Sequence, residues 1–121
     1  MNYSSVTWQK SSVFEGVTFA IRRPSLAQRI ELTTQVRELT LKHEFLKAGD
    51  AGDQLTAALS ELFVTRLYLE WGLVEVGGLL IDGEKATPER MAEFGPEELV
   101  REIVTAIREE SHLTDDERKN S

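Results

Sequence analysis

Two long stretches without glycine or proline place the strongest constraint on the fold of this chain. The first runs from residue 26 to residue 48, and the second from residue 54 to residue 71. Stretches of this length between helix-breaking residues are typical of α-helices. Residues 50–53 leave room only for a tight loop, and helices joined by so short a loop pack antiparallel. The sequence therefore predicts a helical hairpin.

The spacing of residues supports both helices. In the first, intervals of three and four positions place five residues on one stripe: Leu32, Val36, Leu39, His43 and Leu46. In the second, the same intervals relate Leu55, Leu59, Leu62, Arg66 and Leu69. Ser25 and Asp53 stand where a side-chain oxygen caps a helix N-terminus. We expect both stripes to face the core.

Two shorter segments have the patterns of β-strands. Residues 17–21 are rich in β-branched residues and end just before Pro24, which predicts a strand and its stop. Asp82-Gly83 is a strong signal for a two-residue hairpin, because the favoured turn needs positive φ. We expect one small β-ribbon between the helices, within residues 73–86.

Two further helices are expected towards the C-terminus. Thr87 and Pro88 have the residue types of an N-cap and a first helical position, which predicts a short third helix. A fourth helix begins at Pro96, carries a wide apolar stripe and frays near Ser111. The predicted fold class is mainly α (α+β): a helical hairpin plus C-terminal helices, with a short N-terminal strand and a small β-hairpin.

A single domain accounts for the chain. Its 121 residues are enough for one core, and its apolar residues, 40% of the total, are spread along the sequence. We expect this helical domain at residues 17–112. Residues 1–16 are expected to form a flexible N-terminal arm, in which Val6 and Trp8 alternate as in a short strand, and residues 113–121 a polar C-terminal tail. The arm either pairs with a neighbouring subunit by strand addition or is disordered.

Residue types and spacing disfavour a catalytic or metal centre. The chain has no cysteine, so thiolate chemistry and Cys-ligated metals are excluded. Its two histidines, His43 and His112, are not spaced to share one helix face, and no nucleophile elbow or phosphate-loop sequence occurs. We interpret His43 as a partly buried helix residue. We expect no enzyme activity, no cofactor and no bound metal.

Charge and hydropathy narrow the range of partners. The formal net charge of −7 would repel a phosphate backbone, so no nucleic-acid partner is expected. No apolar stretch approaches the ~20 residues that a membrane-spanning helix needs. Residues 1–10 also lack the basic start and apolar run of a secretory signal. We expect a cytoplasmic protein that does not contact a membrane.

The second long helix has more apolar residues than a small hairpin can cover, and they point in nearly every direction. The candidates for partner binding are Phe63, Leu67, Tyr68 and Trp71. Core packing is one explanation for Trp71, and a protein interface is the other, because aromatic side chains contribute to both. Self-association or a bound partner helix would cover this surface.

The order of segments resembles that of a known family. The segments are the strand ending at Arg22-Arg23-Pro24, the long charged helix, the run from Arg66 to Leu73, the ribbon 78–83, the segment 95–99 and the tail 113–120. Over about residues 17–120 they together resemble the small tail assembly chaperones of long-tailed bacteriophages and prophages.

The resemblance implies a mainly helical, homo-oligomeric protein without catalytic residues. Proteins of this family coat the tape measure protein until tail tube subunits polymerise around it, and a longer, frameshifted form recruits the tail tube protein. For this chain, the resemblance implies these two partners and action in the host cell cytoplasm. The alternative is a structural virion subunit such as a head–tail connector, or another small helical protein-interaction module. A small enzyme would instead need a pocket with convergent polar groups.

Overall fold

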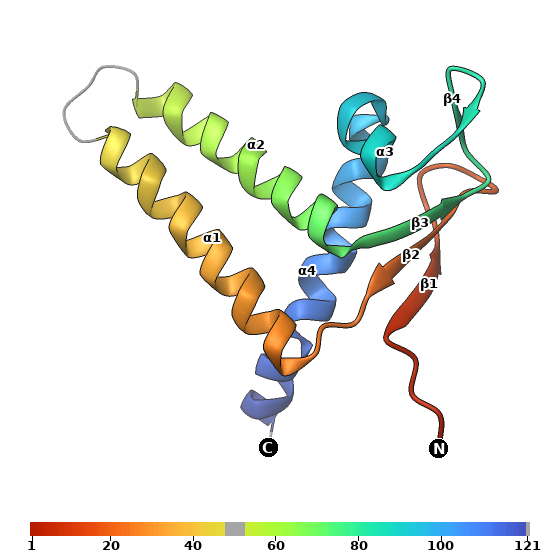
Figure 1. The fold of residues 1–121 in the computed structure, drawn as a ribbon, viewed down its shortest axis with the longest axis horizontal. Coiled ribbons are helices and arrows are strands. Elements are labelled where there is room, and N and C mark those ends of the chain that lie inside the picture. Colours follow the sequence, from red (N-terminus) through yellow and green to blue (C-terminus); the bar gives the residue numbers. More distant parts are fainter. Residues whose placement is uncertain (48–52, 121) are drawn as a thin grey trace.

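The computed structural model describes residues 1–47 and 53–120, which form four helices, a three-stranded sheet and a two-stranded hairpin (Figure 1). In chain order the elements are β1 (Val6–Lys10), β2 (Thr18–Arg22), α1 (Leu26–Lys47), α2 (Asp53–Gly72), β3 (Leu73–Gly77), β4 (Leu80–Ile81), β5 (Glu84–Lys85), α3 (Pro88–Phe94) and α4 (Glu97–Asn120). The predicted mainly helical α+β class is confirmed, including the helical hairpin and the N-terminal strand.

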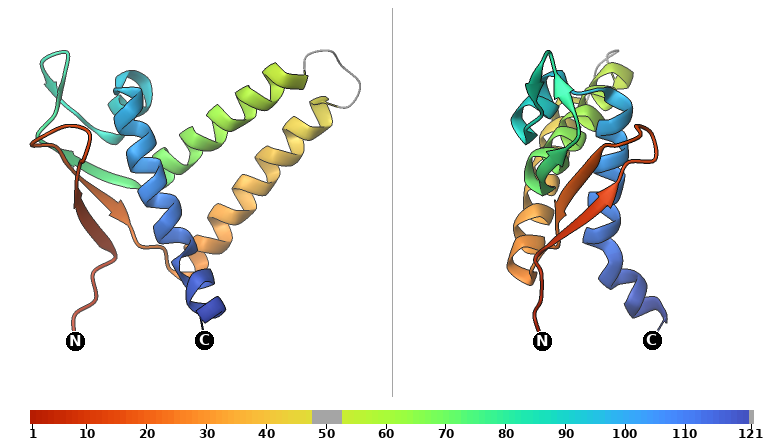
Figure 2. Two further views of the ribbon diagram at one scale, coloured as in Figure 1. Left: turned by 180° about the vertical axis from the view of Figure 1, so that it is seen from behind. Right: turned by 90° about the vertical axis from the view of Figure 1, so that its right-hand side faces the viewer.

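Helices α1 and α2 lie side by side and run antiparallel, and together they project away from the sheet (Figures 1 and 2). Leu32 is buried, while Val36 and Leu39 are half-buried against the core. This part of the first stripe therefore faces inward, as predicted. His43 and Leu46 complete the predicted stripe, but they lie outside the residues whose side chains the structure describes.

Strand β2 is the centre of the antiparallel sheet, with β1 and β3 on either side. Phe19 and Ile21 of β2 are two positions apart, so they share one face of the strand. Both belong to the same buried cluster as Ile103 and Ile107 of α4, which packs against β2. The predicted strand at residues 17–21 therefore packs against α4, the longest helix.

Strand β1 corrects the expectation of a flexible arm at residues 1–16. Residues 6–10 pair with β2 of the same chain, with Trp8 opposite Ala20. The chain reverses between the two strands through Gly16, whose φ of 80° favours glycine. A strand of five residues gains stability only from its neighbours in the sheet, and the sequence of the strand alone does not reveal those neighbours.

The carboxylate of Glu102 on α4 fixes the loop between β1 and β2. It accepts hydrogen bonds of 2.6 Å from the hydroxyl of Ser11, from the hydroxyl of Ser12 and from the backbone N–H of Ser12. Burial acts to raise the pKa of Glu102, but the hydrogen bonds from both serines outweigh it and hold this pKa below its ordinary value. The first hairpin of the chain is thereby fastened to the last helix.

Helix α2 continues directly into β3 at Gly72. A Cβ atom at this position would lie 2.6 Å from Cγ2 of Ile107, so glycine allows the end of α2 to pass close to α4. The ribbon predicted within residues 73–86 is wrong in its first half. Residues 73–77 pair with β2 as the third strand of the sheet, a contact across about fifty residues that local sequence does not determine.

The second half of the predicted ribbon is confirmed. Strands β4 and β5 form a hairpin in which Asp82 and Gly83 have φ angles of 52° and 81°, as the Asp-Gly signal predicts. The third helix also begins as predicted. The Thr87 hydroxyl accepts a hydrogen bond of 3.2 Å from the backbone N–H of Arg90, which caps α3.

Helix α4 is longer than predicted. It begins at Glu97 and continues to Asn120, beyond the expected end near Ser111, so most of the expected tail at residues 113–121 is helical. The segment after Ser111 contains no glycine or proline, and its Glu, Arg and Lys residues are good helix formers. Polarity alone is not a stop signal for a helix.

The core lies where α2, α3 and α4 meet the sheet. Its largest fully buried side chains are Phe19, Ile21, Leu69, Val76, Met91, Leu99, Ile103 and Ile107. Both chain termini lie at the lower end of the molecule, and α3 and the start of α4 lie at the upper end (Figure 1).

Candidate protein-binding surface

The four candidate residues of α2 do not form one exposed patch. Tyr68 is buried, with the guanidinium of Arg108 stacked 4.7 Å from its ring centre. Trp71 and Leu67 are half-buried against the core, and Trp71 stacks on the guanidinium of Arg22 at 5.3 Å. Phe63 is 42% exposed and is the candidate with the most accessible side chain.

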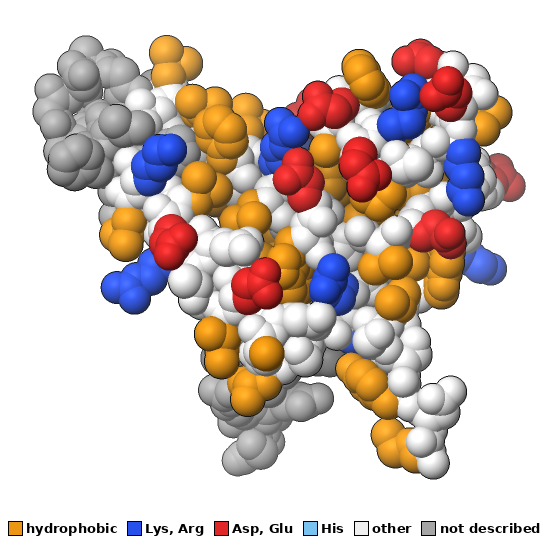
Figure 3. All heavy atoms as spheres, viewed as in Figure 1, with side chains coloured by type: hydrophobic (Ala, Val, Ile, Leu, Met, Phe, Trp, Pro, Cys, Tyr) orange, Lys and Arg blue, Asp and Glu red, His pale blue; other side chains and the backbone are white. Residues whose placement is uncertain are grey.

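The predicted inward stripe of α2 is the better candidate, because most of it faces solvent. Leu69 is buried as expected, but Leu55, Leu59 and Leu62 are 79%, 48% and 60% exposed. This corrects the expectation that the stripe faces the core. The three exposed leucines follow one another at intervals of four and three residues, so they lie in a line along one side of the helix. Figure 3 shows hydrophobic side chains gathered over this part of α2.

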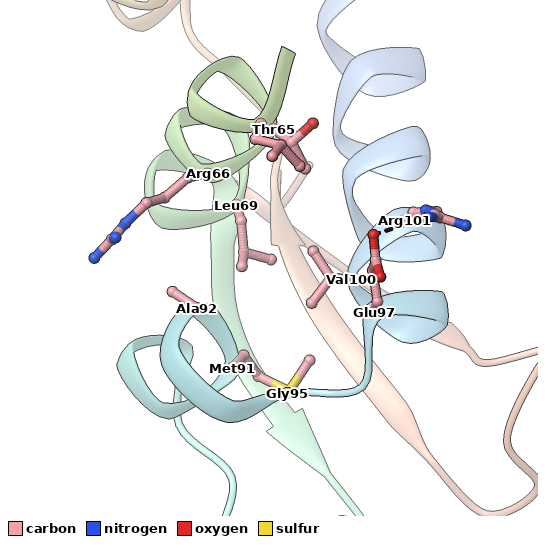
Figure 4. Close-up of a pocket in the computed structure, with 10 residues that line it drawn as sticks. Thr65, Arg66, Leu69, Met91, Ala92, Gly95, Glu97, Val100 and Arg101 are labelled. Carbon is pink, nitrogen blue, oxygen red and sulfur yellow. Dashed lines mark hydrogen bonds and ion pairs between the residues drawn. The ribbon is translucent and has the colours of Figure 1, made fainter. Parts of the chain in front are cut away.

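The exposed stripe leads into a hollow of about 390 Å³ between α2, α3 and the first turn of α4. Its apolar lining includes Leu62, Leu69, Met91 and Val100. In Figure 4, Leu69 and Val100 point into this space from opposite sides, and Met91 lies below them. We call the exposed leucines and this hollow together the α2 groove. A hollow of this size is within the range of ligand sites, at its small end. The groove is therefore large enough to hold apolar side chains of a partner.

The charged residues at the rim of the groove are paired with one another. The Arg66 guanidinium lies 2.7 Å from the carboxylate of Glu70 and 2.8 Å from that of Glu93. The hydrogen bond that Arg66 donates to Glu70, together with the charges of both glutamates, raises the pKa of Arg66 above its ordinary value. Arg101 and Glu97 form a further ion pair at 2.8 Å, drawn in Figure 4.

A second hollow, of about 380 Å³, adjoins the α2 groove. The two hollows share Arg66 and Ala92 in their linings. The second one is lined by the acidic residues Glu70, Glu89 and Glu93. Figure 3 shows Asp and Glu side chains gathered over the junction of α2 and α3, beside the hydrophobic surface of α2.

A separate apolar face lies on α1. Leu26, Ile30 and Leu41 are 76%, 61% and 50% exposed. Their spacing places them on the side of the helix that is turned away from the buried Leu32. The helical hairpin therefore has two exposed apolar surfaces, one on α1 and one on α2.

The described side chains contain no group of three or more His, Cys, Asp and Glu residues that could hold a metal ion. The side chain of His43 lies outside the described residues. Among the described helices, none is both long enough and apolar enough to cross a membrane. Comparison with protein-family models, with curated proteins and with solved structures found no match for this chain.

The sequence revealed the apolar stripe of α2, but it did not reveal that most of this stripe faces solvent. Leu55, Leu59 and Leu62 have the spacing of a buried helix face, and only the position of α3 and α4 leaves them uncovered. The hollow combines residues of three helices, so no local pattern could have revealed it.

Proposed function

We propose that this protein is a non-enzymatic protein-binding module that works as a phage tail assembly chaperone. In this role it binds and coats the tape measure protein during tail morphogenesis, in the cytoplasm of the host cell. The observation that carries the proposal is the α2 groove, an exposed apolar stripe that runs into a hollow between three helices. The resemblance in segment order to the tail assembly chaperones suggests the binding partner, which is the tape measure protein.

An apolar groove on a helical surface suits an amphipathic helix. Such a helix presents apolar residues at i, i+3, i+4 and i+7, which fit a line of leucines at intervals of four and three residues. Full burial of a leucine side chain contributes about 1.5–3 kcal/mol. The loss of translational and rotational freedom on binding offsets much of this. The resulting moderate affinity suits a coat that must later be displaced by tail tube subunits.

The exposed face of α1 supports the proposal of a homo-oligomer. Leu26, Ile30 and Leu41 lie on a surface distinct from the α2 groove, so one copy can contact a neighbour while its groove holds the client. Copies lined up along one long helix would each bind weakly and together bind strongly.

The proposal is tested by co-expression with a candidate tape measure protein. Affinity capture followed by mass measurement of the complex gives the number of copies bound. Many copies on one client support the chaperone. No capture would contradict it, and so would recovery of the chain in purified virions, which would indicate a structural subunit such as a head–tail connector.

A matched pair of variants makes the test specific for the groove. Leu62→Asp places a charge in the groove, and Leu80→Asp places the same charge on a leucine of the β4–β5 hairpin that is similarly exposed. We expect Leu62→Asp to abolish capture and Leu80→Asp to leave it unchanged.

A further inference from the structure

We propose that the α2 groove is specific for an amphipathic helix whose apolar stripe is flanked by lysine or arginine. This inference rests on the proposed function for its site and goes beyond it by specifying the chemistry of the client. It follows from the charge that surrounds the groove.

The rim of the groove has an excess of negative charge. Both of its arginines are already engaged, Arg66 with two carboxylates and Arg101 with one. The two adjoining hollows are lined by these two arginines and by four carboxylates, those of Glu70, Glu89, Glu93 and Glu97, so negative charge is in excess. A client helix that covers the groove would therefore bring its flanking residues close to uncompensated negative charge.

Much of this negative charge lies at the second hollow. It adjoins the apolar hollow through Arg66 and Ala92, and Glu70, Glu89 and Glu93 lie in its lining. Three carboxylates face one guanidinium there. A lysine or arginine of the client, next to the apolar side chain that enters the first hollow, would reach this second hollow, where opposite charge favours it.

The same charge disfavours the other occupants of an apolar groove. A second copy of this chain has a formal net charge of −7, so its approach to an acidic rim is opposed by long-range repulsion. Nucleic acid is repelled for the same reason. A cationic amphipathic helix is attracted, and charge complementarity of this kind increases both the association rate and the specificity.

The test uses three synthetic helical peptides of about 20 residues, or about 30 Å of helix, which is the length of α2. All three have leucine at i, i+3, i+4 and i+7. The flanking positions are lysine in the first, glutamine in the second and glutamate in the third. Binding to the full chain is measured by fluorescence anisotropy.

We expect the lysine peptide to bind at least about tenfold more tightly than the glutamate peptide, with the glutamine peptide between them. The difference should shrink as the salt concentration rises to about 1 M, because ions screen exposed charges. Equal binding of all three peptides would overturn the inference, and so would a preference for glutamate.

Variants of the chain assign the effect to the groove. Glu89→Gln should reduce the preference for lysine, while Glu75→Gln removes an exposed carboxylate of β3 outside the groove and should not. Leu62→Asp should weaken binding of all three peptides. If Glu75→Gln changes the preference as much as Glu89→Gln does, the charge acts through the whole molecule and the assigned site is wrong.

The outcomes separate this inference from the proposed function. Capture of the tape measure protein without a peptide preference would support the proposed chaperone function and contradict the inference of a basic client helix. A lysine preference without capture of the tape measure protein would support the inferred specificity of the groove and contradict the proposed function as a tail assembly chaperone. Failure of all three peptides to bind, with the fold intact by circular dichroism, overturns the groove as a helix site.

Discussion

At the scale of single residues, one carboxylate and one glycine have the clearest consequences. Glu102 joins the β1–β2 loop to α4, and Gly72 allows α2 to pass α4. Neither role could be predicted from the sequence. The partners of Glu102 are about ninety residues away, and a glycine at a helix end is normally explained by the helix stop alone.

Glu102→Gln should lower the free energy of unfolding by about 1–2 kcal/mol at neutral pH, because it removes charge-assisted hydrogen bonds to Ser11 and Ser12. The pKa of Glu102 is depressed in the folded state. Its contribution is therefore complete above the pKa of an unfolded glutamate and is lost as the pH falls through the lower, folded pKa. Urea denaturation of both proteins across the acidic range measures this. A difference that persists at the acid end would contradict the explanation.

Gly72→Ala should lower the free energy of unfolding by about 1–3 kcal/mol, because its new Cβ would press against the fully buried Ile107. The sign is informative, since alanine at an unobstructed helix position is favoured over glycine by about 1 kcal/mol. Chemical denaturation gives the value. An unchanged or more stable protein would mean that α2 and α4 can move apart at no cost.

At the scale of elements, the sequence predicted what each segment is better than what it packs against. Breaks at glycine and proline located the helices, and Asp82-Gly83 located the small hairpin. The pairing of β3 with β2 was missed because register depends on distant strands. Helix α2 was ambiguous because it is apolar on most sides, so its pattern could not distinguish the covered face from the open one.

The exposed part of α2 should be less protected from hydrogen exchange than the core. Amides of residues 56–62 lie beside exposed leucines, whereas Ile103 and Ile107 of α4 are fully buried. We expect exchange on the order of a hundredfold faster in the first segment, because local opening there costs little buried area. Native-state exchange read by mass spectrometry tests this. Equal protection would show that the hairpin opens only when the whole domain unfolds.

At the scale of the whole molecule, the charge and the two exposed apolar surfaces act together. A formal net charge of −7 opposes non-specific clustering, so self-association needs a defined apolar contact. On the proposal that copies of this chain associate, the exposed face of α1 formed by Leu26, Ile30 and Leu41 is the expected contact. The sequence indicated surplus apolar surface on the hairpin, but not that it is divided between two faces.

Ile30→Asp should therefore lower the average mass of the protein in solution without affecting binding to the α2 groove. Leu62→Asp should weaken binding to the α2 groove without affecting the average mass. Light scattering after gel filtration measures the mass, and the lysine peptide measures the groove. If Ile30→Asp and the wild type have the same mass at every concentration, the α1 face is not the contact between copies.

The position of the chain ends has a practical consequence. Helix α4 begins beside the α2 groove and carries the chain over 24 residues, about 36 Å, to the end where the N-terminus also lies (Figure 1). A fluorescent protein or surface anchor fused to either terminus would therefore be held away from the groove. Chains immobilised in this way would present their grooves outward in a single orientation, ready for force or kinetic measurements on one client at a time.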